Sequence, residues 1–354
     1  MSEDEYAPPY RITPTIITLI EQIGEMLGRL SFSSDMKNLR LRRIHRIQTI
    51  HGSLAIEGNT LSEEQISTIL DGKPVIAPPR EVQEVRNAIK AYDEFQHWHP
   101  ERQSDVLKAH KTLMLGLLDA PGHYRRGGVG VGSKSGIVHV APPAGRVPEL
   151  MANLLGWLEK TDAHALIKSC VFHYEFEFIH PFADGNGRMG RLWQTLILAQ
   201  WNPIFSQIPV ESMVYARQQE YYKAIAESTQ AAESTPFVAF MLQTILARMI
   251  RSSTEIEQVT EQATEQVGAL IRVLTDGARG TRALMAALGL KHRPTFMYDY
   301  LQPALASGLV EMTQPDAPRS PTQKYRLTPK GRNVLATGGG HQYRGSAGEI
   351  GAGW

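Results

Sequence analysis

The chain has 354 residues, of which 42% are hydrophobic and 21% charged, and its net charge is +1. This composition is typical of a globular protein with a sizeable core, and the length suggests two or three folding units. A single cysteine, Cys170, excludes an internal disulfide framework, and the opening MSEDEYAPPYR carries no apolar run typical of a secretory signal. No apolar stretch reaches the roughly 18 residues that span a bilayer. We therefore expect a cytoplasmic protein without a membrane partner.

Apolar residues recur at helical spacing through the first hundred residues. This periodicity predicts helices over 16–30, 38–56 and 81–98, with a shorter helix restarting after Thr60. The second of these helices ends at Glu57-Gly58-Asn59, where a glycine follows the last apolar residue. We interpret residues 1–100 as an N-terminal helical region.

A glycine-rich segment follows a predicted helix over 104–118. Valines alternate with glycines up to a turn at 133–136, and three β-branched residues follow, which predicts a short β-hairpin over 127–140. Helical periodicity then resumes over 147–160, 163–178, 188–201, 211–228 and 235–250. The expected fold class is mostly α, a helical core with one short hairpin.

The composition changes towards the C-terminus. Glu-Gln pairs repeat over 255–267 and predict a solvated linker helix over 253–267. Short helices predicted over 270–274, 281–288 and 294–307 are followed by strands over 310–312 and 324–327. This order resembles a winged helix-turn-helix domain at 268–336. Residues 337–354 are glycine-rich and are expected to be disordered.

The charge is unevenly distributed. Residues 268–336 carry ten Lys/Arg against four Asp/Glu, a net charge of +6, which leaves −5 for the remainder. A basic winged helix can bind DNA phosphates, although the same fold also serves protein contacts. DNA binding by this segment is possible but not the favoured interpretation.

Residues 180–191, HPFADGNGRMGR, combine several groups that suit phosphate chemistry. Glycines on both sides of Asn186, at the start of a helix, present backbone N–H groups to an anion. Arg188 and Arg191 share one helical face, Asp184 can ligate magnesium, and His180 can act as a base. The alternative is a buried polar turn without chemistry, but such a turn would not need all of these groups. The segment therefore predicts a phosphate-ester active site.

The spacing H-x-F-x-D-G-N-G-R-x-x-R resembles the signature of the Fic (filamentation induced by cAMP) family, and every position of that signature is present. The resemblance covers about residues 16–250 and implies a Fic catalytic core at 101–252. It further implies a protein adenylyltransferase, which transfers AMP from ATP to a Ser, Thr or Tyr hydroxyl with the help of Mg²⁺.

The resemblance also assigns individual roles. His180 would be the catalytic base and Asp184 the magnesium ligand. Phosphate and nucleotide contacts would come from Gly185, Asn186, Gly187, Arg188 and Arg191. Tyr221 and Tyr222 could border the nucleotide base, although one of them could instead pack in the core.

Residues 53–58, SLAIEG, resemble the inhibitory motif S/T-x-x-x-E-G/N of many Fic proteins. In that family the glutamate pairs with the second arginine of the signature and blocks placement of the γ-phosphate of ATP. The corresponding pair in this chain is Glu57 and Arg191. A carboxylate can occupy the guanidinium group that would otherwise hold a phosphate oxygen. Ser53 lies four residues before Glu57 and could steady it. The alternative is an ordinary helix end with a surface acid.

The 127–140 hairpin matches the position of the family's flap, a hairpin that takes an extended target segment by strand addition. A protein substrate is therefore expected to dock there, although a glycine-rich hairpin without a partner is the alternative. Self-modification and a homodimer are also compatible with the sequence.

Other functions stay open within and outside the family. Some relatives remove AMP from targets, with the inhibitory glutamate aligning a water, and others move phosphate or phosphocholine. From a different class, the chain could be a nucleotide-sensing, DNA-binding transcriptional regulator.

Overall fold

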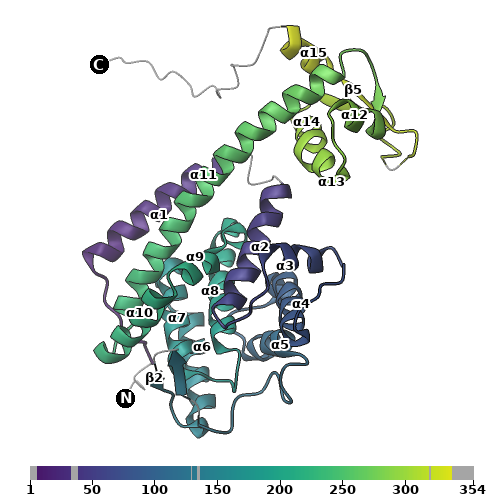
Figure 1. Ribbon diagram of the computed structural model, residues 1–354. Coiled ribbons are helices and arrows are strands. Elements are labelled where there is room, and N and C mark those ends of the chain that lie inside the picture. The colour runs from purple at the N-terminus through teal and green to yellow at the C-terminus, as the bar shows by residue number, and fades with distance from the viewer. Residues whose placement is uncertain (1–5, 33–38, 129, 134–135, 319, 337–354) are drawn as a thin grey trace, which may run out of the picture. The chain divides into compact units, whose positions relative to one another are not determined.

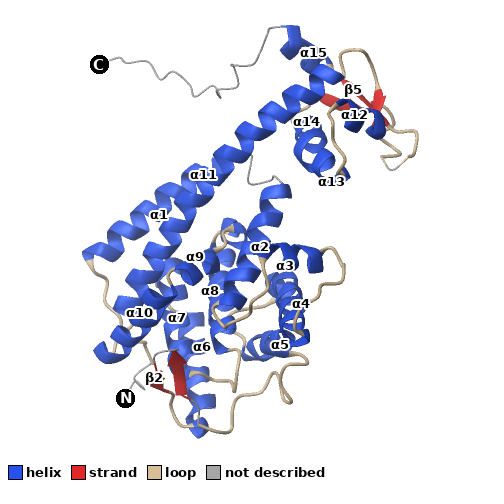
Figure 2. Ribbon diagram, in the orientation of Figure 1, coloured by secondary structure: helices blue, strands red, loops and turns tan. Residues whose placement is uncertain are grey.

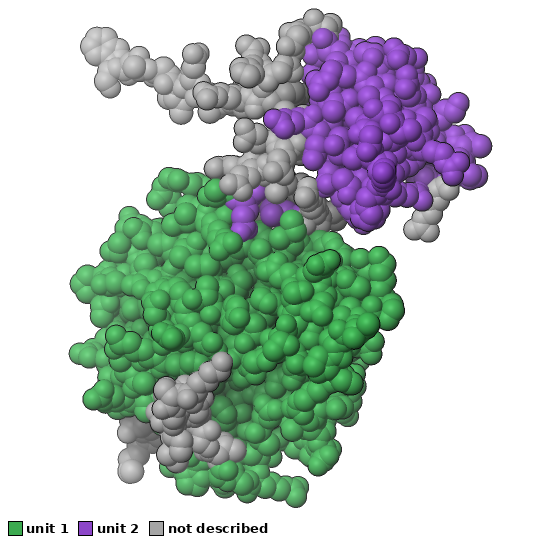
Figure 3. All heavy atoms as spheres, viewed as in Figure 1, with its two compact units in different colours: residues 1–36, 42–254 green, residues 37–41, 255–354 purple. Residues whose placement is uncertain are grey.

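The computed structural model describes residues 6–32, 39–128, 130–133, 136–318 and 320–336. The chain forms two compact units, residues 1–36 with 42–254 and residues 37–41 with 255–354 (Figure 3). Helices dominate, and the strands are short (Figure 2), which confirms the predicted mostly α fold class. Within the described ranges, no helix is both long and apolar enough to cross a membrane.

In its described residues, the first unit is helical apart from one hairpin (Figure 1). Its helices are α1 (Pro14–Phe32), α2 (Leu39–Ala55), α3 (Glu63–Leu70), α4 (Pro79–Glu94), α5 (Gln103–Met114), α6 (Val147–Lys160), α7 (Ala165–Ile179), α8 (Asn186–Trp201), α9 (Val210–Ala216), α10 (Gln218–Ala231) and the first part of α11 (Thr235–Val273). Short 3₁₀ turns are η2 (Phe95–His97), η3 (Ala144–Arg146) and η4 (Pro203–Gln207).

Helices α7 and α8 form the centre of this unit and pack against each other. All residues of α7 except Lys168 and Phe178 are buried, and most of α8 is buried as well. A helix that is apolar around its whole circumference is expected at the centre of a domain. The short connection between these helices, residues 180–185, is therefore held at both ends by the core.

The predicted hairpin is present. Strand β1 (Gly130–Ser133) pairs antiparallel with β2 (Gly136–Val140), with Gly130 opposite Val140 and Ser133 opposite Gly136. The register shifts between Val131 and Gly132, as at a β-bulge.

Gly52 of α2 lies directly against the backbone of α9. A Cβ at this position would stand 2.6 Å from the Ser212 amide nitrogen and 2.7 Å from the Glu211 carbonyl carbon. We expect Gly52→Ala to lower the free energy of unfolding by about 2 kcal/mol, because overpacking forces backbone shifts. Urea unfolding measures this change.

The matched control is Gly24→Ala in α1, where no atom lies within 4 Å of the added Cβ. This variant should be neutral, or more stable by about 0.5 kcal/mol, because alanine favours helix more than glycine does. Equal stability of the two variants would contradict the tight α2–α9 contact.

The second unit contains a three-stranded sheet in the order β3–β5–β4, with β3 (Arg279–Gly280), β4 (Val310–Met312) and β5 (Lys324–Leu327) all antiparallel. The end of α11, α12 (Thr281–Ala287), α13 (Arg293–Thr295), a π-helical turn η5 (Phe296–Leu301), α14 (Gln302–Ala306) and α15 (Pro329–Ala336) accompany it. Its core includes Leu270, Leu284, Phe296, Leu301 and Tyr325. The two predicted strands are present, and β3 is an addition that the sequence analysis missed.

The predicted helix boundaries are wrong in two regions. Separate helices are expected over 235–250, 253–267 and 270–274, but the single helix α11 runs through all three regions and ends at Val273. Residues 237–267 contain no glycine or proline, and Glu, Gln and Ala favour helix, so nothing interrupts it. Conversely, the single helix expected over 211–228 is divided at Arg217 into α9 and α10. Residues 337–354, for which disorder is expected, lie outside the described residues.

Candidate active site

His180 lies where α7 ends and has a left-handed backbone, with φ 50° and ψ 62°. Its backbone N–H donates to the Phe176 carbonyl at 2.9 Å, which closes the last turn of α7. Its Nδ1 lies 3.3 Å from the Glu177 carbonyl oxygen and 3.8 Å from Glu177 Oε2. A proton on Nδ1 suits this carbonyl and leaves Nε2 as the basic nitrogen. The imidazole is 17% exposed, so it can be reached by a substrate.

Glu177 is a buried carboxyl group beside His180. Its side chain is 5% exposed, and its Oε1 also lies 3.9 Å from His173 Nε2. Desolvation raises the pKa of Glu177 to about 8, although the positive charge of Arg191 works in the opposite direction. The group is therefore mainly protonated at neutral pH. Two residues earlier, burial raises the pKa of Glu175 to about 7, and its hydrogen bond from Tyr6 opposes this shift.

These pKa values predict a pH-dependent stability. Between pH 4.5 and about 8 the folded protein keeps a proton on Glu177 that the unfolded chain has released, so stability falls as the pH rises through this window. Each such proton changes the unfolding free energy by at most about 1.4 kcal/mol per pH unit. We expect the thermal midpoint of the wild type to fall more steeply from pH 5 to pH 8 than that of Glu177→Gln.

An exposed carboxyl group provides the control for this comparison. Glu159→Gln, at the exposed end of α6, should give a curve parallel to that of the wild type. Parallel curves for Glu177→Gln and the wild type would show that Glu177 does not hold its proton in the folded state.

The loop before α8 is closed by its own side chains. Asn186 is buried; its Oδ1 accepts from the Phe182 N–H at 2.8 Å and its Nδ2 donates to the Phe182 carbonyl at 2.9 Å. The Asn186 amide thus closes the loop through both its oxygen and its nitrogen. His110 of α5 stacks on Phe182, with ring centroids 3.7 Å apart, and its Nε2 lies 3.0 Å from the Asp184 carbonyl oxygen. The Gly122 N–H donates to His110 Nδ1, which leaves the proton on Nε2.

Arg188 and Arg191 are both buried on α8, and each faces a carboxylate from the N-terminal helices. Arg191 Nη2 donates to Glu57 Oε1 at 2.6 Å and to the Ser53 carbonyl at 2.9 Å. Arg188 Nη2 donates to Asp184 Oδ1 at 3.2 Å, and its Nη1 lies 3.5 Å from Glu84 Oε1. Within the described residues, Nε and Nη1 of Arg188 have no hydrogen-bond partner. Such buried donors without a hydrogen bond suit an anion.

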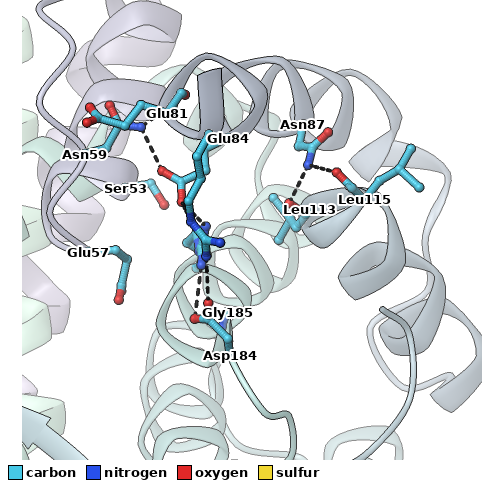
Figure 4. Close-up of polar contacts among 12 residues, drawn as sticks. Ser53, Glu57, Asn59, Glu81, Glu84, Asn87, Leu113, Leu115, Asp184 and Gly185 are labelled. Atoms are coloured by element: carbon cyan, nitrogen blue, oxygen red, sulfur yellow. Dashed lines mark hydrogen bonds and ion pairs between the residues drawn. The ribbon is translucent and has the colours of Figure 1, made fainter. Parts of the chain in front are cut away.

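Glu84 connects Arg188 to the segment that carries Glu57. Its Oε2 accepts from Asn59 Nδ2 at 2.8 Å, so the contacts run from Asn59 through Glu84 and the Arg188 guanidinium to Asp184 (Figure 4). Helix α4 is itself held beside α5, because Asn87 Nδ2 donates to the Leu113 and Leu115 carbonyls at 3.0 and 2.8 Å. Glu84 therefore belongs to a fixed part of the site.

Glu57 lies against the first turn of α8. A Cβ added to Gly187 would stand 2.3 Å from Glu57 Oε1 and 2.9 Å from Arg191 Nη1, so only glycine leaves room for this carboxylate. The N-terminus of a helix favours a negative charge, and Glu57 supplies one at this position. An incoming phosphate that used the same donors would have to compete with it.

Asp184 is the candidate magnesium ligand. Its side chain is 41% exposed, its Oδ1 accepts from the Gly185 N–H at 2.6 Å, and its Oδ2 lies 3.5 Å from Arg80 Nη2. Within the described chain, no three His, Cys, Asp or Glu side chains converge to hold a metal by themselves. A single exposed carboxylate nevertheless fits Mg²⁺, which proteins often bind through one or two carboxylates together with substrate phosphates.

The two tyrosines differ in their surroundings. Tyr221 is 1% exposed, and its hydroxyl lies 3.1 Å from His173 Nε2. Tyr222 is half-buried and meets Tyr221 edge to face, with ring centroids 5.4 Å apart. Tyr221 thus packs in the core, which was one of the two possibilities for this pair, and Tyr222 is the more accessible of the two.

Three residues of the site were missed by the sequence analysis: Glu84, His110 and Glu177. Each of them contacts the 180–191 segment, either across a tertiary interface or over one helical turn. Their positions in the sequence do not distinguish them from neighbouring polar residues. The only sequence signal for Glu177 is that it lies three residues before His180.

The chain is similar to known proteins over both units. The profile of the Fic/DOC family matches residues 100–198, and that of the filamentation induced by cAMP protein Fic-like, C-terminal domain, matches residues 265–328. A solved Fic family protein from Desulfovibrio desulfuricans G20 is 52% identical, with a TM-score of 0.71 over 92% of this chain and 99% of that one. Fic-1 (residues 134–508) from C. elegans shares the fold, with 23% identity and a TM-score of 0.55 over 69% of this chain and 72% of that one.

Two named enzymes are also similar in sequence. Protein adenylyltransferase Fic of Aedes aegypti is 29% identical over 62% of this chain and 45% of the enzyme. Protein adenylyltransferase fic-1 of Caenorhabditis briggsae is 29% identical over 64% of this chain and 44% of the enzyme. The matched region spans less than half the length of either adenylyltransferase.

Proposed function

The chain belongs to the Fic family, and we propose that it is a protein adenylyltransferase, which transfers AMP from ATP to a hydroxyl group of a protein. One observation carries this proposal. The N-terminus of α8 brings together a reachable histidine, an exposed aspartate and two buried arginines, and Arg188 presents N–H groups that lack a hydrogen-bond partner within the described residues. This is the arrangement that a polyphosphate substrate and a hydroxyl nucleophile require.

His180 is the general base of the proposed reaction. Its Nδ1 faces the Glu177 carbonyl, so Nε2 is the nitrogen that would take the proton of the target hydroxyl. The hydroxyl oxygen then attacks the α-phosphorus in line, and pyrophosphate leaves. A magnesium ion held by Asp184 would supply positive charge to the phosphate oxygens.

The remaining groups bind and orient the nucleotide. The α8 N-terminus, with the backbone N–H groups of Asn186 and Gly187, stabilises negative charge on the phosphates. Arg188 and Arg191 hold the part that leaves as pyrophosphate. Glu84 keeps Arg188 in place before the nucleotide arrives, because it lies 3.5 Å from the Arg188 guanidinium and is itself bonded to Asn59.

Glu57 keeps the enzyme in an inhibited state in this proposal. The Glu57–Arg191 distance of 2.6 Å supports this role, because a guanidinium engaged by a carboxylate is not free to bind the γ-phosphate. Ser53 contributes through its backbone, since its carbonyl accepts from the same Arg191 Nη2. The inhibited state therefore depends on the position of the α2 C-terminus as well as on the charge of Glu57.

Intact-mass measurement tests the proposal. Glu57→Gly protein incubated with ATP and Mg²⁺, alone or with a protein extract, should show proteins heavier by one AMP unit, and EDTA should prevent this change. An unchanged mass in all proteins, under conditions where ATP still binds, would argue against transfer.

Removal of AMP is the second candidate, because Glu57 lies at the phosphate-binding end of α8, where it could align a water. The same substitution separates the two activities. Glu57→Gly should raise the rate of AMP addition if Glu57 only inhibits, whereas it should abolish the removal of AMP from a previously modified protein if Glu57 activates water.

A further inference from the structure

Arg125 is a buried arginine between α5 and β1, and it is 6% exposed. Its Nε donates to the His180 carbonyl at 2.7 Å, and its Nη2 donates to the Ile179 carbonyl at 3.2 Å. Its Nη1 donates to the Gly127 carbonyl at 2.9 Å, and Nη2 donates also to the Pro142 carbonyl at 2.5 Å. All three guanidinium nitrogens are therefore used by backbone carbonyls.

These carbonyls belong to three separate pieces of chain. Ile179 and His180 lie at the C-terminal end of α7, where the last carbonyls have no partner within the helix and the helix dipole is negative. Gly127 and Pro142 lie just outside the two strands of the hairpin, one before β1 and one after β2. The Arg125 backbone joins the same cluster, because its N–H donates to the Pro181 carbonyl at 2.9 Å.

A buried cation without a carboxylate partner is unusual, because burial of charge is unfavourable unless polar groups compensate it. Within the described residues, the partners of Arg125 are carbonyl dipoles rather than an acid. A lysine could not replace this arrangement, since one ammonium nitrogen cannot reach carbonyls that the planar guanidinium contacts in different directions.

The His180 backbone needs such support. A left-handed conformation at a residue other than glycine is unfavourable and persists only where the surroundings enforce it. His180 has φ 50°, and its own carbonyl is the acceptor of the 2.7 Å hydrogen bond from Arg125. The direction of the imidazole therefore depends on this contact.

We propose that Arg125 is a positioning residue for AMP transfer, because its guanidinium fixes the His180 backbone and both ends of the 127–140 hairpin relative to one another. This inference rests on the proposed function. It assigns Arg125 a part in aligning the base with a hydroxyl presented by the hairpin, and none in binding ATP, which is held by α8 and the arginines.

The test uses full-length Glu57→Gly protein as the parent, with Arg125→Lys and Arg125→Ala added separately. Arg126→Lys is the matched control, because Arg126 is adjacent in sequence and exposed. The measurements are the maximal rate of AMP incorporation, the ATP concentration at half-maximal rate, the Kd for ATP and the thermal midpoint.

We expect Arg125→Lys to lower the maximal rate by about 10²-fold, the loss that a small misplacement of reacting groups produces. The half-saturating ATP concentration and the Kd should change by less than about threefold, because interactions with the nucleotide remain. Arg125→Ala should lower the rate at least as much, and Arg126→Lys should match the parent.

A rate for Arg125→Lys equal to that of Arg126→Lys would overturn the proposal. So would a parallel loss of rate, ATP affinity and thermal midpoint in both Arg125 variants, since that pattern indicates a structural role alone. If the Glu57→Gly parent binds ATP but transfers no AMP, the proposed function fails before Arg125 is tested, so the two failures are distinguishable.

Discussion

His180→Ala should lower the rate of AMP transfer by about 10³-fold, because it removes the group that takes the proton from the target hydroxyl. ATP binding should be nearly unchanged, since the arginines and the α8 N-terminus remain. The effect should be measured in the Glu57→Gly background, by incorporation of α-labelled ATP alongside the Kd for ATP.

The backbone of His180 requires a second variant. His180 has a left-handed conformation, which asparagine adopts more readily than alanine, so His180→Asn keeps the turn but lacks a basic nitrogen. Both variants should lose activity alike, while His97→Ala, an exposed histidine in η2, should keep it. Labelling that persists in His180→Asn would exclude His180 as the base.

Glu57→Gly should raise the rate of AMP transfer by about 10- to 100-fold, the range of typical coupling energies between sites. The substitution frees Arg191 Nη2, which otherwise donates to Glu57 Oε1 at 2.6 Å, and it removes a carboxylate from the first turn of α8. ATP should also bind more tightly. Initial rates of labelling and calorimetric titration with ATP measure the two effects.

Two further substitutions separate charge from shape at this position. Glu57→Gln keeps the size of the side chain but weakens the contact with Arg191, so an intermediate rate is expected. Glu64→Gln, at an exposed position of α3, should behave as the wild type. Equal rates for the wild type and Glu57→Gly would show that the observed ion pair does not inhibit the enzyme.

Much of the fold follows from local sequence signals. Helix α6 begins and ends at the predicted residues 147 and 160, and the glycines and β-branched residues at 127–140 form the expected hairpin. The length of α11 was harder to predict, because its Glu-Gln repeats have no apolar period and yet contain no helix breaker. The two-residue strand β3 owes its existence to pairing with β5, which lies over 40 residues away in the sequence.

The residues of the site also differ in how far the sequence predicts their contacts. Residues that are close in sequence, from His180 to Arg191, could be grouped by their spacing. The pairing of Arg191 with Glu57 could be anticipated only through the resemblance of residues 53–58 to an inhibitory motif. The contacts of Glu84 and Arg125 depend on how α4 and the hairpin ends meet the loop, and no local pattern encodes these contacts. The motif position of Asn186 predicts a phosphate contact, and only the structure shows that its side-chain amide also closes the loop on Phe182.

We propose that the inhibited site at the start of α8 transfers the AMP portion of ATP to protein. The most direct measurement compares Glu57→Gly protein incubated with ATP labelled at the α-phosphorus and with ATP labelled at the γ-phosphorus. We expect the α-label to become attached to protein and the γ-label to be released with pyrophosphate. Attachment of the γ-label to protein would contradict AMP transfer. So would attachment of neither label under conditions where ATP still binds.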